Sequence, residues 1–385
     1  MRDRPLRVVV VGAGAIGRVH ARVACDDPDL EVIGIVAPSP DRAERLADDV
    51  AATGARRPVV SGALSSILAA NDADLVAVCT PSGSHAELAY EAMTAGAHVV
   101  IEKPVASSLR RSRQLLSESE GPRAHGRVIS VISQHRFDSG ASFLHKAIAQ
   151  GRLGRPTSAI GSVGWWRSQS YYDSGAWRGT WQLDGGGAVM NQAVHTVDLL
   201  LWLMGRPAEV SAYTRLLGHE RIEVEDTAVA AIAFESGALA VLHATTAAYP
   251  GVGARLQFMG SRGSAIVDND RLSYFHAASP WQEAPPMGWN ATANQLDDLP
   301  EEVRGEQAYA DPTVSPVGHA RQYRDIVEAI RTHREPDVTI EDGVVVVAAV
   351  HAIYASAHLG RPVRFEDVIS GAYDELQFSV PAHNP

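Results

Sequence analysis

The chain has 385 residues, with 34 Lys and Arg against 45 Asp and Glu, which gives a formal net charge of −11. Hydrophobic residues make up 45% and charged residues 21%, an ordinary composition for a folded chain of two or three domains. An acidic chain without a dense basic cluster argues against partners such as nucleic acid or an anionic membrane.

Two cysteines exclude a disulfide framework. The first residues enter a strand pattern without the apolar stretch and cleavage site of a signal peptide, and the apolar runs are shorter than the ~20 residues of a membrane span. We therefore expect a cytoplasmic globular protein.

The first third of the chain alternates short β-branched runs with helical patterns. Strands are expected at 7–11, 32–36, 59–60, 75–79, 98–101 and 128–133, and helices at 15–26, 41–52, 64–70 and 85–95. This alternation predicts βαβ units and therefore a doubly wound parallel sheet, an α/β fold, in a first domain of residues 1–137.

After Phe137 the pattern changes from alternation to consecutive strands. A helix is expected at 138–150, a strand at 156–166, a long helix at 187–204, strands at 209–215, 227–235, 239–246, 255–259 and 264–268, and helices at 319–332 and 342–359. These strands predict a large open, mainly antiparallel sheet in an α+β second domain, 138–385. Residues 279–317 lack periodicity and predict a long loop, whose role at the site or at an interface stays open.

A glycine-rich turn, Gly12-Ala13-Gly14-Ala15-Ile16-Gly17, lies directly between the first strand and the first helix. Gly12 permits a tight turn, Gly14 allows the backbone to approach a pyrophosphate, and Gly17 allows close contact between helix and strand. The free N–H groups of the helix then face the phosphates. In this context the motif predicts a dinucleotide-binding Rossmann domain; the alternative is a glycine-rich turn without a ligand.

The end of the second strand bears on which dinucleotide is bound. Sites for NAD commonly place Asp or Glu there to accept from the ribose 2′-hydroxyl, and this chain has Ala37. Without that negative charge a 2′-phosphate is not repelled, and Ser39 and Arg42 are within reach of one. We therefore expect NADP(H), with NAD(H) as the alternative; Arg42 could equally be a solvated helix residue.

Two further segments directly follow strands of the predicted parallel sheet. Thr80, Pro81 and His85 follow the fourth strand, and Glu102-Lys103-Pro104 follows the fifth. Ligands of open α/β sheets bind at the carboxyl ends of the strands, so both segments are expected at the cofactor. Lys103 lies between an apolar strand and a proline, which favours a functional ammonium over a merely solvated one.

A triglycine, residues 185–187, precedes an apolar helical pattern that carries Asn191, His195 and Asp198. The spacing i, i+4, i+7 places the three polar side chains on one helix face. Unpaired burial would cost roughly 1–3 kcal/mol for each, so the stripe predicts a functional site. His195 suits acid and base chemistry near neutral pH. No further clustered ligands complete a metal site, so we expect none.

Aromatic residues cluster just before this helix. Four of the seven tryptophans fall between Trp165 and Trp181, interleaved with Arg167, Tyr171-Tyr172 and Trp177-Arg178. Flat aromatic faces beside hydrogen-bonding groups suit a polyhydroxylated ring, although core packing explains some of them. The predicted substrate-binding residues are Lys103, Arg167, Tyr172, Asn191, His195 and Asp198.

Together these motifs resemble the Gfo/Idh/MocA oxidoreductase family over nearly the whole chain. The resemblance runs through the glycine turn, Glu102-Lys103-Pro104, 152–156, the triglycine helix, 225–227 and 260–263. Within the family, 171–195 looks like members that act on sugars, sugar acids and nucleotide sugars.

The resemblance implies that Lys103 and His195 form the catalytic pair. A third family residue, frequently Asp, is Asn191 here and cannot carry charge, so it would orient substrate without raising the basicity of His195. The resemblance also implies cofactor contacts from 80–85, Glu102, Lys103 and Trp177-Arg178, a cis bond before Pro104, and a homodimer or homotetramer formed through the open sheet.

The resulting hypothesis is hydride transfer between nicotinamide and a secondary hydroxyl or keto carbon of a pyranose, a cyclitol or a sugar derivative. His195 would move the hydroxyl proton, and Lys103 would stabilise the developing negative charge on the same oxygen. Two alternatives stay open: a non-catalytic sensor that binds NAD(P) and sugar, and a glycoside hydrolase that oxidises its substrate transiently with NAD.

Overall fold

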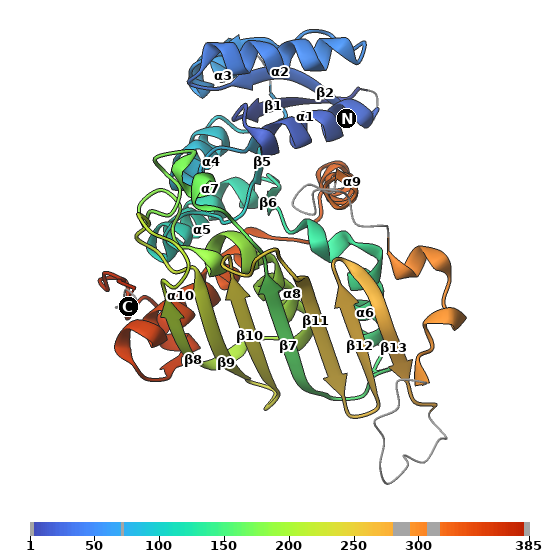
Figure 1. The fold of residues 1–385 in the computed structure, drawn as a ribbon. Coiled ribbons are helices and arrows are strands. Elements are labelled where there is room, and N and C mark those ends of the chain that lie inside the picture. The colour runs from blue at the N-terminus through green and yellow to red at the C-terminus, as the bar shows by residue number, and fades with distance from the viewer. Residues whose placement is uncertain (1–3, 71–72, 280–292, 306–315, 381–385) are drawn as a thin grey trace. The chain divides into compact units, whose positions relative to one another are not determined.

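The protein is described by a computed structural model that covers residues 4–70, 73–279, 293–305 and 316–380. The described chain divides into two compact units (Figure 1). Unit 1 contains Met1–Gln134, Gln182–Gly185 and Thr313–Val347, and unit 2 contains His135–Trp181, Gly186–Pro312 and Ala348–Pro385. Each unit has its own sheet.

Unit 1 is built on a six-stranded parallel sheet. The strands are β1 (Leu6–Val11), β2 (Leu30–Val36), β3 (Val59–Ser61), β4 (Leu75–Val78), β5 (His98–Ile101) and β6 (Ile129–Val131), in the order β3-β2-β1-β4-β5-β6. The strand order reverses between β1 and β4, which makes this boundary the switch point of a doubly wound fold. The prediction of a Rossmann sheet is confirmed.

Helices cover both faces of this sheet. They are α1 (Ala15–Asp26), α2 (Pro40–Ala52), α3 (Leu64–Ala70), α4 (His85–Thr94), α5 (Leu109–Ala124) and α9 (Pro316–Thr332), with a 3₁₀ turn η1 (Ser82–Ser84) before α4. Val8 and Val10 of β1 face one hydrophobic core, whereas Val9 and Val11 face the other. Burial on both sides explains why β1 is apolar without alternation.

Unit 2 contains an eight-stranded sheet in which one pair, β7–β10, is parallel and the other described pairs are antiparallel. Its strands are β7 (Pro156–Gly164), β8 (Pro207–Arg215), β9 (Thr227–Phe234), β10 (Leu239–Thr245), β11 (Gly253–Gly260), β12 (Gly263–Asp268), β13 (Arg271–Ala277) and β14 (Val363–Arg364), in the order β13-β12-β11-β7-β10-β9-β8-β14. The predicted mainly antiparallel sheet is confirmed, and β13 and β14 were not predicted.

The helices of unit 2 include one irregular element. The predicted helix 187–204 is a π-helix, η3 (Ala188–Ala193), followed by α8 (Val194–Met204). The other elements are η2 (Gln134–Phe137), α6 (Ser139–Ala149), α7 (Gln169–Asp173), η5 (Leu296–Asp298), η6 (Glu301–Arg304), α10 (Ile340–Leu359), which begins in unit 1, and α11 (Phe365–Ile369). Of the predicted loop 279–317, residues 280–292 and 306–315 lie outside the described residues.

Helix α10 is the one described helix that is long and apolar enough to span a membrane, with a mean hydropathy of 1.5. The helix is not an uninterrupted apolar run, because it contains Glu341, Asp342 and His351. Of its most apolar window, 72% is buried inside the protein, which is typical of a core helix in a soluble protein.

We expect Gly17→Ala to destabilise unit 1, because a Cβ at this position would lie 1.8 Å from the carbonyl oxygen of Gly12. The free energy of unfolding should fall by about 1–3 kcal/mol, the usual cost of overpacking. Gly14→Ala is the matched control, since a Cβ there meets nothing within 4 Å. Urea unfolding followed by circular dichroism measures both variants, and equal midpoints would contradict the expectation.

Candidate active site

Three neighbouring strands of unit 1 end at one edge of the parallel sheet. The glycine turn follows β1, Thr80 follows β4 and Lys103 follows β5. Gly12 has a φ of 114°, and a Cβ on it would lie 2.5 Å from the carbonyl oxygen of Cys79. The chain can therefore make this turn only with glycine, and the turn leaves Gly14 and Ala15 exposed, Ile16 half-buried and Gly17 buried at the start of α1.

The adjacent strand β2 ends without a carboxylate. Ala37 is buried and donates its amide hydrogen to Ser61 O over 3.1 Å. Ser39 is the N-cap residue of α2 and accepts no hydrogen bond with its side chain from the helix, and Arg42 lies exposed in the first turn. The edge therefore offers a hydroxyl, a guanidinium and a helix N-terminus.

His85 connects the ends of β4 and β5. Its two ring nitrogens each lie 2.7 Å from a carbonyl oxygen, that of Pro104 and that of Thr80. Thr80 Oγ1 accepts from Ser84 Oγ at 2.8 Å, and Pro81 is exposed. Because the ring of His85 is 1% exposed, the side chain fixes the two strand ends.

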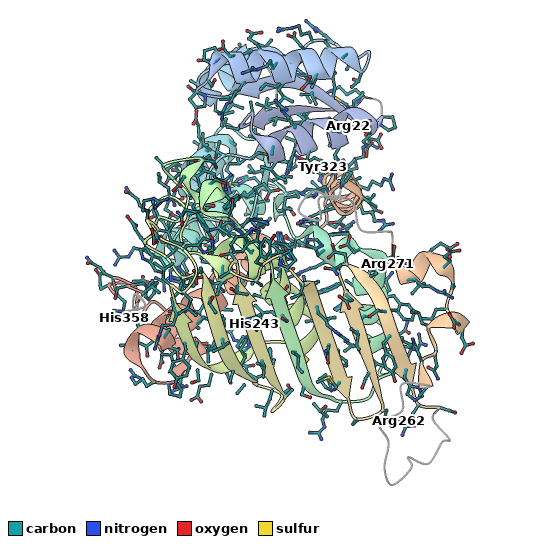
Figure 2. The ribbon with its side chains drawn as sticks, in the orientation of Figure 1. Arg22, His243, Arg262, Arg271, Tyr323 and His358 are labelled. Atoms are coloured by element: carbon teal, nitrogen blue, oxygen red, sulfur yellow. The ribbon has the colours of Figure 1, made fainter. Side chains whose placement is uncertain are left out.

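A buried carboxylate supports the backbone at Lys103. Glu102 is 4% exposed, and its Oε1 lies 3.0 Å from Nε2 of His20 and 3.4 Å from Nε2 of His319. Tyr323 on α9 (Figure 2) donates its hydroxyl to Nδ1 of His20 over 2.7 Å. Burial raises the pKa of Glu102, but the hydrogen bonds from His20 and His319 outweigh burial and hold it well below its usual range.

The second carboxylate oxygen of Glu102 accepts from the amide of Lys103 at 3.0 Å. The peptide between Lys103 and Pro104 is cis, as the resemblance implied, and the Lys103 side chain is half-buried. Glu102 thus holds the backbone at Lys103 with a carboxylate already occupied by three donors, and its predicted contact with a cofactor stays a prediction.

In unit 2, another buried carboxylate fixes the triglycine turn. Glu225 is fully buried and accepts from the amides of Gly187 at 3.0 Å and Val189 at 2.8 Å and from the hydroxyl of Tyr354 at 2.9 Å. Burial raises its pKa to about 7 in spite of these donors. Gly186 has a φ of 156° and accepts from Asn191 Nδ2 at 2.8 Å. Glu225 therefore sets the start of the π-helix, a form of helix that often occurs at functional sites.

The three polar side chains of the predicted stripe have different surroundings. Asn191 lies on the π-helix, and His195 lies half-buried on α8. Asp198 is 4% exposed and accepts from Arg136 at 2.6 and 3.0 Å. This ion pair favours a structural role for Asp198, whose predicted contact with substrate stays a prediction.

One group beside His195 was missed by the sequence reasoning. The ring of His135 lies edge to face with that of His195, with centroids 4.8 Å apart and an interplanar angle of 78°. Both residues line a pocket together with Trp165, Gln192, Arg255 and Asp270. His135 comes from the turn after β6 and Asp270 from the turn between β12 and β13, so no local spacing could have indicated this cluster.

The aromatic segment forms a stack of rings and guanidinium groups. The Cζ of Arg178 lies 4.2 Å from the ring centroid of Tyr171 and 4.4 Å from that of Trp177, and Arg167 lies 5.3 Å from Tyr171. Tyr172 is buried, and its hydroxyl hydrogen-bonds Thr246 at 2.9 Å. The predicted binding residues of this segment therefore include two half-buried guanidinium groups and one tyrosine fixed in the core.

Among the described residues, two groups have donor atoms close enough to hold a metal ion, namely His20, Glu102 and His319, and His135, Asp138 and Asp270. Hydrogen bonds within each group already account for its geometry. The expectation that no metal is used stays a prediction.

The predicted catalytic residues belong to different units. Lys103 and the predicted cofactor residues of the sheet edge lie in unit 1, whereas Asn191, His195 and the aromatic segment lie in unit 2. In each unit a buried carboxylate fixes the backbone beside the predicted catalytic residues. The pairing of Lys103 with His195 stays a prediction.

Comparison with known proteins identifies the family of both parts of the chain. Residues 6–131 match the oxidoreductase family with an NAD-binding Rossmann fold, and residues 142–266 match the GFO/IDH/MocA C-terminal domain. The WlbA dehydrogenase of Bordetella pertussis, solved with NADH and UDP-GlcNAcA, is 32% identical with a TM-score of 0.80, and the match covers 94% of this chain and 99% of that one.

Two curated relatives are also similar. The 1,5-anhydro-D-fructose reductase of Ensifer adhaerens is 27% identical, over 93% of this chain and 98% of its own. The inositol 2-dehydrogenase of Rhizobium meliloti is 27% identical, over 73% of this chain and 82% of its own. The chain belongs to the Gfo/Idh/MocA family of NAD-binding oxidoreductases, which confirms the predicted family and enzyme class.

Proposed function

We propose that the protein transfers hydride between C4 of a nicotinamide and a secondary carbinol carbon of a sugar, cyclitol or sugar acid. The observation that carries this proposal is the sheet edge of unit 1, where a glycine turn, Thr80 and Lys103 follow adjacent strands. Relatives named as a sugar reductase and an inositol dehydrogenase, and a structure with a bound nucleotide sugar acid, support the substrate class.

In this proposal the residues of the two units act on one hydroxyl group. During oxidation His195 accepts the hydroxyl proton while the electron pair of the adjacent C–H bond leaves as hydride for the nicotinamide. Lys103 hydrogen-bonds the same oxygen, an interaction that strengthens as negative charge develops in the transition state. Asn191 orients the substrate, and Arg167, Tyr171 and the neighbouring aromatic rings cover one face of its ring.

We further propose that the cofactor is NADP(H). The buried Ala37 replaces the carboxylate that would repel a 2′-phosphate, and Ser39 and the exposed Arg42 are available to bind one. Related structures contain NADH, so NAD(H) is expected to bind as well, more weakly than NADP(H). The two cysteines are free, which is consistent with the cytoplasm as the site of action.

We further propose that the chain associates with a second copy of itself. Helices α6 and α8 lie behind the sheet of unit 2, and the opposite face is open in Figure 1. That face exposes 65% of Tyr213, 59% of Leu239 and 51% of Val241. Contiguous apolar patches are uncommon on monomers, so we propose that two copies associate through this face.

A screen of sugars, cyclitols and sugar acids with NAD⁺ and NADP⁺ tests the function. We expect reduced nicotinamide to appear with at least one substrate, and faster with NADP⁺ at equal concentration. A sensor would bind ligands without producing reduced cofactor. A hydrolase would release an aglycone without net reduction, and either result would contradict the proposal.

We expect Lys103→Ala to lower kcat by at least ~10²-fold, because the oxygen would lose its cationic partner in the transition state. Lys146→Ala is the matched control, since Lys146 is the other lysine of the chain and lies exposed on α6. Steady-state kinetics with a substrate from the screen measures both. Near-normal turnover in the Lys103 variant would eliminate the proposed role.

We expect Val241→Glu to convert the oligomer to monomers, because a twofold interface would bring two uncompensated carboxylates into an apolar contact. Val252→Glu serves as control, since Val252 is 80% exposed in the loop before β11. Sedimentation velocity gives the mass of each form. A monomeric wild type, or an unchanged mass for the Val241 variant, would overturn the proposed interface.

A further inference from the structure

Two arginine side chains of unit 2 pack against the ring of one tyrosine. The Cζ of Arg178 lies 4.2 Å from the ring centroid of Tyr171, and the Cζ of Arg167 lies 5.3 Å from it. Arg167 also lies 5.4 Å from the ring centroid of Trp165, and Arg178 lies 4.4 Å from that of Trp177. Two positive charges therefore share a small aromatic surface in a chain whose formal net charge is −11.

Neither guanidinium group is neutralised by an acid of the protein. Within the part of the chain that the structure describes, their side-chain contacts are with aromatic rings and, for Arg167, with one backbone carbonyl group. Asp173, the acidic residue of the short helix α7, pairs instead with Arg221 at 2.9 Å. The charges of Arg167 and Arg178 are therefore available to an anion from outside the chain.

Arg167 has hydrogen-bonding capacity that the protein leaves unused. One of its Nη atoms donates to the carbonyl oxygen of Trp166 at 3.2 Å, whereas its Nε is buried and has no hydrogen-bond partner among the described residues. A guanidinium that packs against aromatic faces keeps its N–H groups in its own plane, where they match the oxygens of a carboxylate or phosphate. Because an unsatisfied buried donor is costly, Nε indicates an acceptor that a ligand supplies.

The short helix that carries Tyr171 is held in place by its neighbours. Tyr172 is buried, and its hydroxyl lies 2.9 Å from Thr246 Oγ1. Gln169 exchanges two hydrogen bonds with the backbone of Glu220, at 2.7 and 2.9 Å. The ring of Tyr171 therefore has a defined position, and the guanidinium groups that pack on it are arranged before a ligand binds.

Trp165 connects the two arginines to the predicted site. Its ring lies beside Arg167, and the residue lines the same pocket as Gln192 and His195. Arg167 is therefore separated from this pocket by a single aromatic side chain.

We propose that Arg167 binds an anionic group of the substrate, a carboxylate or a phosphate, so that the enzyme acts on acidic sugars in preference to neutral ones. This inference rests on the proposed function and narrows its substrate class to sugars with a negative charge. With its reacting hydroxyl at His195, the substrate ring would extend across Trp165 toward Arg167. Arg178 adds a second positive charge beside the same tyrosine ring and strengthens the attraction.

The first test measures binding to the wild-type protein saturated with reduced nicotinamide cofactor, which cannot accept hydride from a ligand. Calorimetry compares glucose, galactose and mannose with their uronic acids and their 6-phosphates, and UDP-glucose with UDP-glucuronate. At least one acidic form should bind at least ~10-fold more tightly than its matched parent. A uronic acid in this place identifies the anion as a carboxylate, and a 6-phosphate identifies it as a phosphate. If no acidic form binds more tightly than its parent, the inference is overturned.

The second test removes the charge of Arg167. In Arg167→Gln the preferred acidic ligand should bind about 10- to 100-fold more weakly, the usual effect of losing a hydrogen bond between charged groups, while the neutral parent binds as before. Arg167→Lys keeps the charge without the fork of N–H donors and should lose less. Arg155→Gln, at an exposed position just before β7, is the matched control. Equal losses for acidic and neutral ligands, or no loss for either, would show that Arg167 only packs against the rings and would contradict the inference.

Neither binding test depends on turnover, so the inference and the proposed function can fail separately. If the protein binds an acidic ligand through Arg167 and oxidises none of the screened compounds, the proposed function is wrong and the anion site stands. If it oxidises neutral and acidic sugars with equal kcat/KM, the inference is wrong and the proposed function stands.

Discussion

The structure of unit 1 depends on the buried carboxylate of Glu102. A carboxylate at 4% exposure is stable only if donors surround it, and here they come from α1, α9 and the amide of Lys103. The helix that begins at the glycine turn is thereby linked to the strand end that carries Lys103. Helix α9, over two hundred residues away in sequence, completes the link through His319 and Tyr323.

In unit 2 the buried carboxylate of Glu225 likewise fixes a segment of backbone. Its carboxylate accepts from the first amides of the π-helix, so the backbone before Asn191 and His195 is held by a buried acid from the segment before β9. Beside it, Asp198 anchors Arg136, whose neighbour His135 contacts His195. In both units a buried acid fixes the backbone next to a residue that the sequence predicts to be catalytic.

Local sequence pattern was sufficient for most of the fold and for the glycine turn. The β-branched run at 7–11 and the strand patterns at 227–235 and 239–246 are short-range signals, and the structure has strands at each of these places. Helix α5 was missed because its exposed face is highly polar, with Leu109, Ser112, Leu115 and Ser119 as its buried residues. The π-helix and the contacts of His135 could not be predicted, because both depend on partners distant in sequence, Glu225 and Asp270 respectively.

The proposed function requires Lys103 and His195 to contact the same substrate oxygen. A crystal structure with NADH and a substrate identified by screening tests it most directly, through the distances from that oxygen to Lys103 Nζ and to the nearer ring nitrogen of His195. We expect both distances to be about 2.6–3.2 Å, with the oxygen-bearing carbon next to nicotinamide C4. Nitrogens that face separate cavities, or that contact different atoms of the ligand, would contradict it.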